Sequence, residues 1–431
     1  MQIADLYQLF LQNPDVTTDT RQCRRNSIFF ALRGTSFDGN QFALQALDAG
    51  CAYAVIDDET IQGDDRLIHV DDVLQTMQQL AAYHRHQLNI PIVQITGTNG
   101  KTTTKELTSA VLSAAYKVLY TQGNFNNHIG VPKTLLRLTA EHQIAVIETG
   151  ANHPGEIALL SELVDADCGL ITNVGHAHLE GFGSFEGVVQ AKGELYEALR
   201  QKKDGFVFLD GDNENLTRIA EGLKAETYGK PGQGYDVEGE VVECNPMLKF
   251  RFRTKGGEWQ TVQTHLIGAY NVTNALAAIA VGVHFGVTPE QAAEAIAAYE
   301  PSNNRSELVI TDSNRLIVDA YNANPTSMKA ALENFALIPD DHKMVILGEM
   351  RELGYASASE HRKVADLAKE VCRKHIWLVG DEFRFVAEGA HWYPDVEAVK
   401  VALQGGNRPY GRLILIKGSN GTKLYELPEF L

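Results

Sequence analysis

The stretch QITGTNGKTTT at residues 94 to 104 constrains the fold of this chain more than any other segment. A β-branched run ends in glycine-bounded residues and an amphipathic pattern follows, which predicts a strand, a tight loop and a helix. In such loops the glycines let backbone N–H groups turn inward, and the helix presents its positive N-terminus to an anion. We therefore expect a nucleotide phosphate site. Its expected members are Gly97, Thr98, Asn99, Gly100, Lys101, Thr102 and Thr103.

The loop departs from the common G-x-x-x-x-G-K-[ST] form, because Ile95 stands where that form has its first glycine. The alternative interpretation is a plain glycine turn with a solvated Lys101. The preceding strand and the following helix, with Leu107 and Val111 on one face, favour the phosphate site.

The composition indicates a globular protein of several domains. The 431 residues include 44% hydrophobic and 22% charged side chains, and we expect three domains. Asp and Glu number 55 against 38 Lys and Arg, giving a net charge of −17 that would repel a polyphosphate backbone. Nucleic acid is therefore not an expected partner.

The cysteines and the N-terminus indicate a cytoplasmic protein. No C-x-x-C pair occurs, which predicts buried free thiols in a reducing compartment. The segment MQIADLYQLFLQNPDV has no basic region, and no apolar run approaches the roughly 18 residues of a membrane span. We expect no membrane insertion and a monomer. The cysteines are Cys23, Cys51, Cys168, Cys244 and Cys372.

Strand-like and helical segments alternate along the chain, which predicts α/β units in series. One boundary falls near residue 89, before the strand IPIVQIT, and a second falls in the polar stretch at 301–304. Within the central unit, residues 235–267 read as antiparallel strands added to a parallel sheet. No G-x-G-x-x-G follows a strand beyond residue 305, which weakens a dinucleotide interpretation there. The predicted domains are 1–89, 90–302 and 303–431.

Two strand ends carry candidate metal ligands. Mg²⁺ bound to phosphates needs an acidic companion for the Thr102 hydroxyl, and Glu148 follows the apolar run IAVI. His176 and His178 follow GLITNV, so they should lie at the same sheet edge. The H-x-H pair could be a zinc site, two surface histidines or part of a magnesium site, although zinc lacks an obvious third ligand. Lys192 lies in the helical VVQAKGELYEAL, and by default such a lysine is solvated.

Ten segments spread over the whole chain share the pattern of one known family. They are TDTRQCRRNSIFFALRGTSFDGN (18–40), ITGTNGKTTT (95–104), GNFNNHIGVPKTLL (123–136), ETGANHPGEI (148–157), NVGHAHLEGFGS (173–184), AKGELY (191–196), GAYNVTNALAA (268–278), DAYNANPTSM (319–328), LGEMRELG (347–354) and KGS (417–419). With these segments the chain resembles the ATP-dependent Mur ligase family of peptidoglycan synthesis. The resemblance implies a small N-terminal α/β domain binding a UDP-sugar, a central P-loop ATPase domain with a parallel sheet, and a C-terminal Rossmann-like domain closing over ATP and binding an incoming dipeptide.

The resemblance also implies roles at the nucleotide site. Lys101 would contact the outer phosphates, while Thr102, Glu148 and His178 would help hold two magnesium ions. Lys192 matches the lysine that the family carbamylates with CO₂, which reverses its default interpretation. Asn271 matches an adenine contact, and Arg305 and Asp319 match phosphate and ribose contacts. The implied catalytic residues are Lys101, Glu148, His178, Lys192 and Arg305.

The implied reaction is ATP-dependent ligation of D-alanyl-D-alanine to UDP-N-acetylmuramoyl-tripeptide through an acyl phosphate, with ADP as product. A hinge near 300–304 would let the third domain close and protect that intermediate. The implied substrate contacts are Thr20, Arg21, Ser27, Phe37, Asp38, Gly39, Asn124, Asn126, Asn127, Tyr321 and Asn322.

Two departures and three rival interpretations qualify the match. Asn420 stands where the family carries arginine after KGS, so Lys423 compensates or the contact is absent, and Val318 stands where relatives often have aspartate. Ligases adding diaminopimelate carry a D-N-P-R motif that this sequence lacks. A folate polyglutamate ligase would lack the first domain. A scaffold without catalysis is the third rival. The residues that argue against it are the intact Lys101, Glu148, His178 and Lys192.

Overall fold

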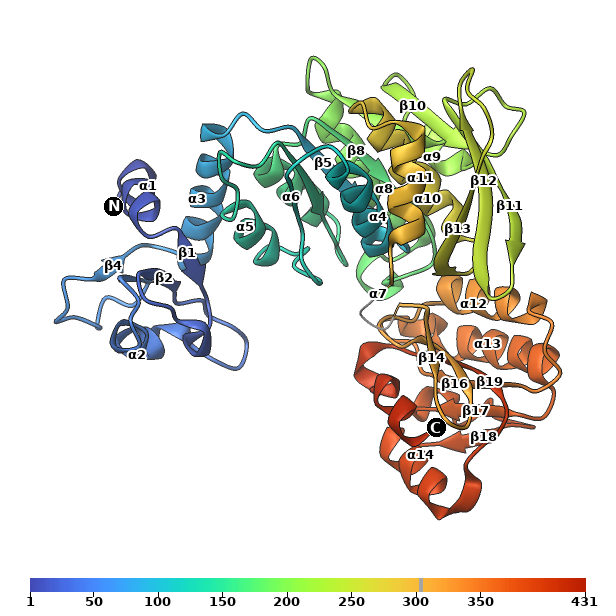
Figure 1. The fold of residues 1–431 in the computed structure, drawn as a ribbon. Coiled ribbons are helices and arrows are strands. Elements are labelled where there is room, and N and C mark those ends of the chain that lie inside the picture. The colour runs from blue at the N-terminus through green and yellow to red at the C-terminus, as the bar shows by residue number, and fades with distance from the viewer. Residues whose placement is uncertain (302–304) are drawn as a thin grey trace.

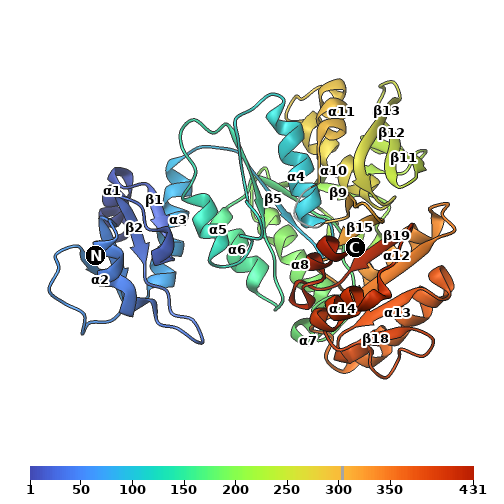
Figure 2. The same cartoon turned by 60° about the horizontal axis from the view of Figure 1, so that its bottom comes forward.

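The computed structural model describes residues 1–301 and 305–431, which form three α/β units, each built on its own sheet (Figure 1). In both views the first unit lies on the opposite side of the central unit from the third (Figure 2). The three sheets lie within residues 15–69, 92–267 and 307–417. The domain boundaries stay a prediction, because the proposed linker and hinge fall partly on residues 302–304, outside the described residues.

The first unit is a parallel sheet in the order β1-β2-β3-β4. Its longest helix, α3, also anchors the unit to the central one. The buried Arg85 of α3 donates to the carbonyl of Val164 (3.2 Å), and His84 Nε2 contacts the carbonyl of Leu138 (2.9 Å). The elements are α1 (Ile3–Gln12), β1 (Asp15–Thr17), β2 (Ser27–Phe30), α2 (Ala43–Asp48), β3 (Tyr53–Ile56), β4 (Leu67–His69) and α3 (Val73–Gln87).

The central sheet has the order β13-β12-β11-β10-β9-β8-β5-β7-β6. The strands β5 to β10 pair in parallel, and β11, β12 and β13 continue the sheet as antiparallel neighbours, which confirms the prediction for 235–267. Its strands are β5 (Ile92–Thr96), β6 (Val118–Tyr120), β7 (Ile144–Glu148), β8 (Cys168–Ile171), β9 (Phe206–Asp210), β10 (Lys224–Gly229), β11 (Val237–Cys244), β12 (Met247–Thr254) and β13 (Gln260–Ile267).

Helices cover both faces of this sheet, because neighbouring strand residues point to opposite sides. In β5, Ile92 packs in the core beneath α6 and α8, whereas Val93 packs in the core beneath α4 and α10. The helices are α4 (Lys101–Ser113), α5 (Gly130–Leu135), α6 (Glu156–Val164), α7 (Leu179–Phe182), α8 (Phe185–Arg200), α9 (Glu214–Ile219), α10 (Asn271–His284) and α11 (Pro289–Ala298).

The third sheet has the order β14-β15-β19-β16-β17-β18 and is parallel except for β14. Its arrangement is the Rossmann-like α/β fold predicted for this part of the chain. The helices α12 and α13 cover one face and α14 the other. The elements are β14 (Glu307–Ile310), β15 (Arg315–Asp319), α12 (Pro325–Leu337), β16 (Lys343–Gly348), α13 (Ser357–Cys372), β17 (Ile376–Val379), β18 (His391–Tyr393), α14 (Val396–Ala402) and β19 (Leu413–Lys417).

The cysteines are free thiols, as predicted, but not all are buried. Cys51, Cys168 and Cys372 are buried, whereas Cys23 and Cys244 are half-buried. Across the described ranges, no helix combines the length and apolarity needed to cross a membrane.

Candidate active site

The phosphate-loop prediction is confirmed in its local structure, since β5 ends at Thr96 and α4 begins at Lys101. Two glycines are required by their surroundings. Gly97 has φ +142° and a Cβ there would lie 2.1 Å from Thr172 Oγ1, while Gly100 has φ +78° and its Cβ would lie 2.6 Å from Asn274 Oδ1. Only glycine combines these backbone angles with so close an approach. The N–H groups of Thr98 and Asn99 donate to Asn173, so the N–H groups of the first turn of α4, which have no partner within the helix, are the ones available to an anion.

Lys101 lies over this loop rather than in solvent. Its Nζ donates to the carbonyls of Gly97 (2.8 Å) and Thr98 (3.0 Å). Burial lowers the pKa of Lys101 to about 8, an effect that Glu148 opposes and Arg305 reinforces. Lys101 is half-buried and its ammonium is bonded to the loop, which does not favour the solvated-lysine alternative.

The loop opens into a cavity of about 790 Å³ between the central and third units. It contains most of the residues predicted for the nucleotide and several predicted for substrate. The predicted residues that line it are Thr98, Asn99, Gly100, Lys101, Thr102, Thr103, Asn126, Asn127, Glu148, His178, Asn271, Arg305, Asp319, Tyr321 and Asn322. Their individual roles stay predictions. The predicted residues outside its lining are Thr20, Arg21, Ser27, Phe37, Asp38, Gly39, Gly97, Asn124 and Lys192.

Glu148 has the environment of a cation ligand. It ends β7 and is 1% exposed. Its Oε1 accepts hydrogen bonds from Thr102 Oγ1 (3.2 Å) and Asn126 Nδ2 (2.8 Å). Its Oε2 is buried and has no hydrogen-bond partner among the described residues. A buried carboxylate oxygen without a donor is costly unless a cation supplies the missing interaction, so this set of residues fits Mg²⁺.

Any metal here would depend on the nucleotide for part of its coordination. Within residues 1–301 and 305–431, no group of three or more His, Cys, Asp or Glu side chains is arranged to hold an ion. Mg²⁺ normally keeps several waters and takes phosphate oxygens beside one or two protein ligands. Thr102 and Glu148 are two such protein ligands.

The two histidines after β8 have different environments, which does not favour an H-x-H zinc pair. His176 packs its ring edge-on against Phe185, with centroids 5.1 Å apart, and its N–H donates to Thr326 Oγ1. His178 lines the cavity, and its Nδ1 contacts the carboxylate of Glu352 in the third unit. Burial lowers the pKa of His178, which keeps the ring neutral near pH 7, although Glu352 opposes this shift. A neutral ring is what metal binding requires.

Lys192 is buried, so its default interpretation as a solvated residue is wrong. It lies on α8, is 2% exposed, and donates from Nζ to the carbonyl of Ala151 (2.9 Å), a residue of the cavity wall. Burial, reinforced by Lys101, lowers the pKa of Lys192 to about 7. Helical spacing contained the signal, because Val188 and Leu195 share its face of the helix.

The third unit contributes a second set of charged groups to the cavity. The Arg305 guanidinium lies 4.0 Å from the centre of the Tyr321 ring. Asp319, at the end of β15, accepts a hydrogen bond from Lys417 Nζ (2.6 Å), and Lys417 also donates to the carbonyl of Asn322 (3.1 Å). Because Lys417 is 2% exposed, it fixes Asp319 from within the sheet edge.

The predicted UDP contacts lie in the first unit, away from the cavity. The Ser27 hydroxyl is buried and donates to the carbonyl of Arg24 (2.8 Å), so it stabilises its own turn. Arg21 pairs with Asp19 (2.8 Å), and its side chain is 88% exposed, which leaves it accessible to an anionic ligand.

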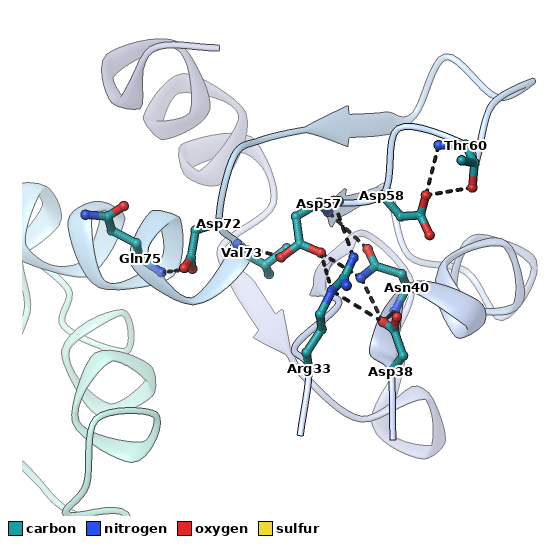
Figure 3. A network of polar contacts seen from close by, with 9 residues as sticks. All are labelled: Arg33, Asp38, Asn40, Asp57, Asp58, Thr60, Asp72, Val73 and Gln75. Atoms are coloured by element: carbon teal, nitrogen blue, oxygen red, sulfur yellow. Dashed lines mark hydrogen bonds and ion pairs between the residues drawn. The ribbon is translucent and has the colours of Figure 1, made fainter. Parts of the chain in front are cut away.

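A polar network holds the Phe37–Asn40 segment of this unit in place (Figure 3). The buried Asn40 donates through Nδ2 to Asp38 Oδ1 (2.8 Å) and Asp57 Oδ1 (2.7 Å), and its Oδ1 accepts from the Asp57 N–H. Arg33 Nε donates to the same Asp57 oxygen (2.8 Å). Asp38 therefore shapes the loop, while Phe37 remains exposed.

Sequence reasoning missed several amides that organise the phosphate loop. Asn173 accepts at Oδ1 from the Asn99 N–H (3.0 Å), and Asn274 accepts from the Thr104 hydroxyl (3.1 Å). Asn324, the N-cap of α12, donates through Nδ2 to Asn99 Oδ1 (2.8 Å). The Asn-Pro pair at 324–325 signals a helix start, but nothing in the sequence brings it to the loop. Lys417 was missed because strand order puts β19 beside β15.

A strand–loop–helix phosphate site, with candidate cation ligands beside it and a second α/β unit across the cavity, is the arrangement of a nucleotide-dependent enzyme. Family models match three consecutive segments: "Mur ligase family, catalytic domain" at 15–85, "Mur ligase middle domain" at 95–282 and "Mur ligase, glutamate ligase domain" at 304–420. The chain belongs to the Mur ligase family. It is therefore an ADP-forming ligase of amide bonds.

Relatives of known type match the chain over nearly its full length. The UDP-N-acetylmuramoyl-tripeptide–D-alanyl-D-alanine ligase of Bacillus subtilis is 38% identical, covering 100% of this chain and 97% of that protein. A crystal structure of MurF from Acinetobacter baumannii superposes with a TM-score of 0.86 at 33% identity, covering 96% and 93% of the two chains. A MurF ligase from Thermotoga maritima in complex with ADP shares the fold, with a TM-score of 0.84 at 23% identity and 97% of each chain covered.

Proposed function

We propose that this protein joins D-alanyl-D-alanine to UDP-N-acetylmuramoyl-tripeptide, with conversion of ATP to ADP and phosphate. The observation that carries the proposal is the 38% sequence identity, over 100% of this chain, with a ligase named for this reaction. The cavity supports it, because nucleotide-site and candidate substrate residues of two units share one space. The product would be the UDP-muramoyl-pentapeptide precursor of peptidoglycan, made in the bacterial cytoplasm.

A peptide carboxylate is a poor electrophile toward an amine, so the reaction must first activate it. The carboxylate attacks the γ-phosphorus of ATP, which forms an acyl phosphate and releases ADP. The amine of the dipeptide then attacks the acyl carbon, and collapse of the tetrahedral intermediate releases phosphate. Such a reaction depends on positioning and on neutralisation of charge. Lys101 and Arg305, which face the same cavity, supply positive charge at the phosphates.

The hydroxyl, carboxylate and imidazole groups beside the phosphate loop are the candidate metal ligands. Thr102, Glu148 and His178 would hold magnesium, which when bound would neutralise negative charge on the phosphates. The unpartnered Glu148 Oε2 supports this assignment. We expect two ions, with Lys192 contributing to the second as a carbamate.

Lys192 suits carbamylation, in which an unprotonated amine attacks CO₂ to form an N–C bond and releases one proton. A pKa of about 7 leaves a large share of the amine unprotonated at neutral pH. The carbamate would replace a buried cation near Lys101 with an anion, which removes like-charge repulsion.

Phosphate release by the purified protein tests the proposal. ATP and Mg²⁺ are supplied with UDP-muramoyl-tripeptide and, in turn, D-Ala-D-Ala, free D-Ala, a diamino acid or no amine. We expect rapid release only with both the tripeptide nucleotide and the dipeptide. Release that depends on another amine would contradict the proposed substrates. No release with any pairing would favour the scaffold interpretation.

A further inference from the structure

Two segments with unusual backbone conformations meet where the central and third units touch. His178 immediately precedes α7 with φ +50°, and Glu352 precedes the turn Gly354–Ala356 with φ +60°. Non-glycine residues seldom occupy this left-handed region, and they persist there only where surrounding contacts hold them. The two residues are therefore held in place by specific interactions.

Side-chain and backbone contacts join these segments. The Glu352 carboxylate contacts His178 Nδ1, and the Glu180 N–H donates to the Glu352 carbonyl (3.3 Å). A Cβ at Gly354 would meet Glu180 at ordinary contact distance, so the turn packs directly on α7. His178 thus depends on the third unit for the orientation of its ring.

The contact also determines which ring nitrogen is available. An ionised carboxylate accepts hydrogen bonds and donates none, so the nitrogen facing Glu352 carries the proton. In a neutral imidazole the other nitrogen, Nε2, then has the free lone pair. Histidines that bind metals are commonly held in this way, with the second nitrogen donating to a carboxylate.

We propose that Glu352 is a positioning residue of the metal site, which fixes the Nδ1–H tautomer of His178 and leaves Nε2 for magnesium. Because Glu352 belongs to the third unit, the ring is oriented only when that unit is docked on the central one. Docking and metal binding are therefore coupled through this pair. The inference rests on the proposed role of His178 as a metal ligand.

Metal affinity without turnover tests the inference. Mn²⁺, as a spectroscopic substitute for Mg²⁺, is titrated into the enzyme–ADP complex and followed by electron paramagnetic resonance. We expect Glu352→Ala to weaken Mn²⁺ binding about 10- to 100-fold, as is typical when the partner of a metal-bound histidine is removed. Glu352→Gln retains an acceptor oxygen for Nδ1–H, so its loss of Mn²⁺ affinity should be smaller.

A matched control removes another carboxylate from the same unit. Glu397 lies on α14, is exposed and pairs with Lys400, so Glu397→Ala should leave Mn²⁺ affinity unchanged. The ring nitrogens of His178, assigned in ¹⁵N spectra by their loss in His178→Gln, should show the Nδ1–H tautomer in the parent and a shift toward Nε2–H in Glu352→Ala.

The outcomes separate this inference from the proposed function. If His178→Gln weakens Mn²⁺ binding but Glu352→Ala and Glu352→Gln do not, the positioning role is wrong and the metal role of His178 stands. If His178→Gln itself has no effect, both are wrong. An unchanged His178 tautomer in a folded Glu352→Ala would also overturn the inference.

Discussion

Buried cations are the residue-scale feature that most distinguishes this cavity. Burial, reinforced by Lys101, lowers the pKa of Lys192 to about 7, and burial, reinforced by Arg305, lowers the pKa of Lys101 to about 8. Such clusters destabilise the empty protein and favour anionic ligands or modification. Binding of phosphate, or carbamylation of Lys192 by CO₂, would therefore relieve the electrostatic repulsion between the cations at this site.

Replacement of Lys192 by methionine should stabilise the unliganded protein in a pH-dependent way. Folded Lys192 titrates at about 7 and the unfolded residue near 10.5, so the unfolded chain binds more protons between these values. The destabilisation is therefore complete below about pH 7 and lost as the pH rises toward about 10.5. Urea unfolding in CO₂-free buffer should show the largest gain for Lys192→Met at low pH. A difference that does not change with pH would contradict this, and Lys203→Met, at an exposed position, is the control.

Carbamylation of Lys192 should be visible directly. Protein equilibrated with ¹³C-bicarbonate at slightly alkaline pH is expected to show a carbamate carbon resonance that disappears in Lys192→Met. The Lys203→Met control should retain it. A resonance that persists in Lys192→Met would assign the modification to a different lysine.

At the scale of elements, the phosphate loop depends on glycine and on α10. Gly100→Ala should weaken ATP binding and lower the free energy of unfolding by about 1–3 kcal/mol, because alanine strains the left-handed backbone and collides with Asn274. Gly256→Ala is the control: it has φ +75° with open space around it, between β12 and β13. It should lose stability but keep its ATP affinity. Equal ATP binding by both variants would contradict the role of the loop.

Individual strands, loops and helices could be predicted from the sequence, but contacts between distant parts of the chain could not. The run QITGTNGKTTT contains its own strand, loop and helix, and IAVIE places Glu148 at a strand end, so both could be predicted locally. Lys417 and Asn324 could not, because their contacts with Asp319 and Asn99 join residues far apart in the chain. Lys192 stands between these cases: its spacing from Val188 and Leu195 places it on the buried face of α8, but the default interpretation from the sequence was a solvated lysine.

At the scale of the whole molecule, the third unit contacts the phosphate loop through Asn324 and Asn99, whereas the sheet of the first unit lies away from that loop (Figure 1). The predicted UDP contacts, such as Arg21, are therefore not at the cavity in this arrangement. A substrate that spans both must bring its reacting carboxylate from the first unit to the loop.

Binding of both substrates should therefore make the molecule more compact. Small-angle scattering with a non-hydrolysable ATP analogue and UDP-muramoyl-tripeptide should give a smaller radius of gyration than the free protein. Either ligand alone should have a lesser effect, because closure protects the acyl phosphate only when both are present. No compaction with both ligands bound would contradict the hinge predicted near 300–304.

The central claim is ligation through an acyl phosphate, and isotope transfer tests it most directly. The tripeptide carboxylate is labelled with ¹⁸O and turned over with ATP and D-Ala-D-Ala, and the released phosphate is analysed by mass spectrometry. Attack of the carboxylate on the γ-phosphorus places one labelled oxygen between carbon and phosphorus, so each phosphate released with product should carry one ¹⁸O. Product formation with unlabelled phosphate would contradict the account.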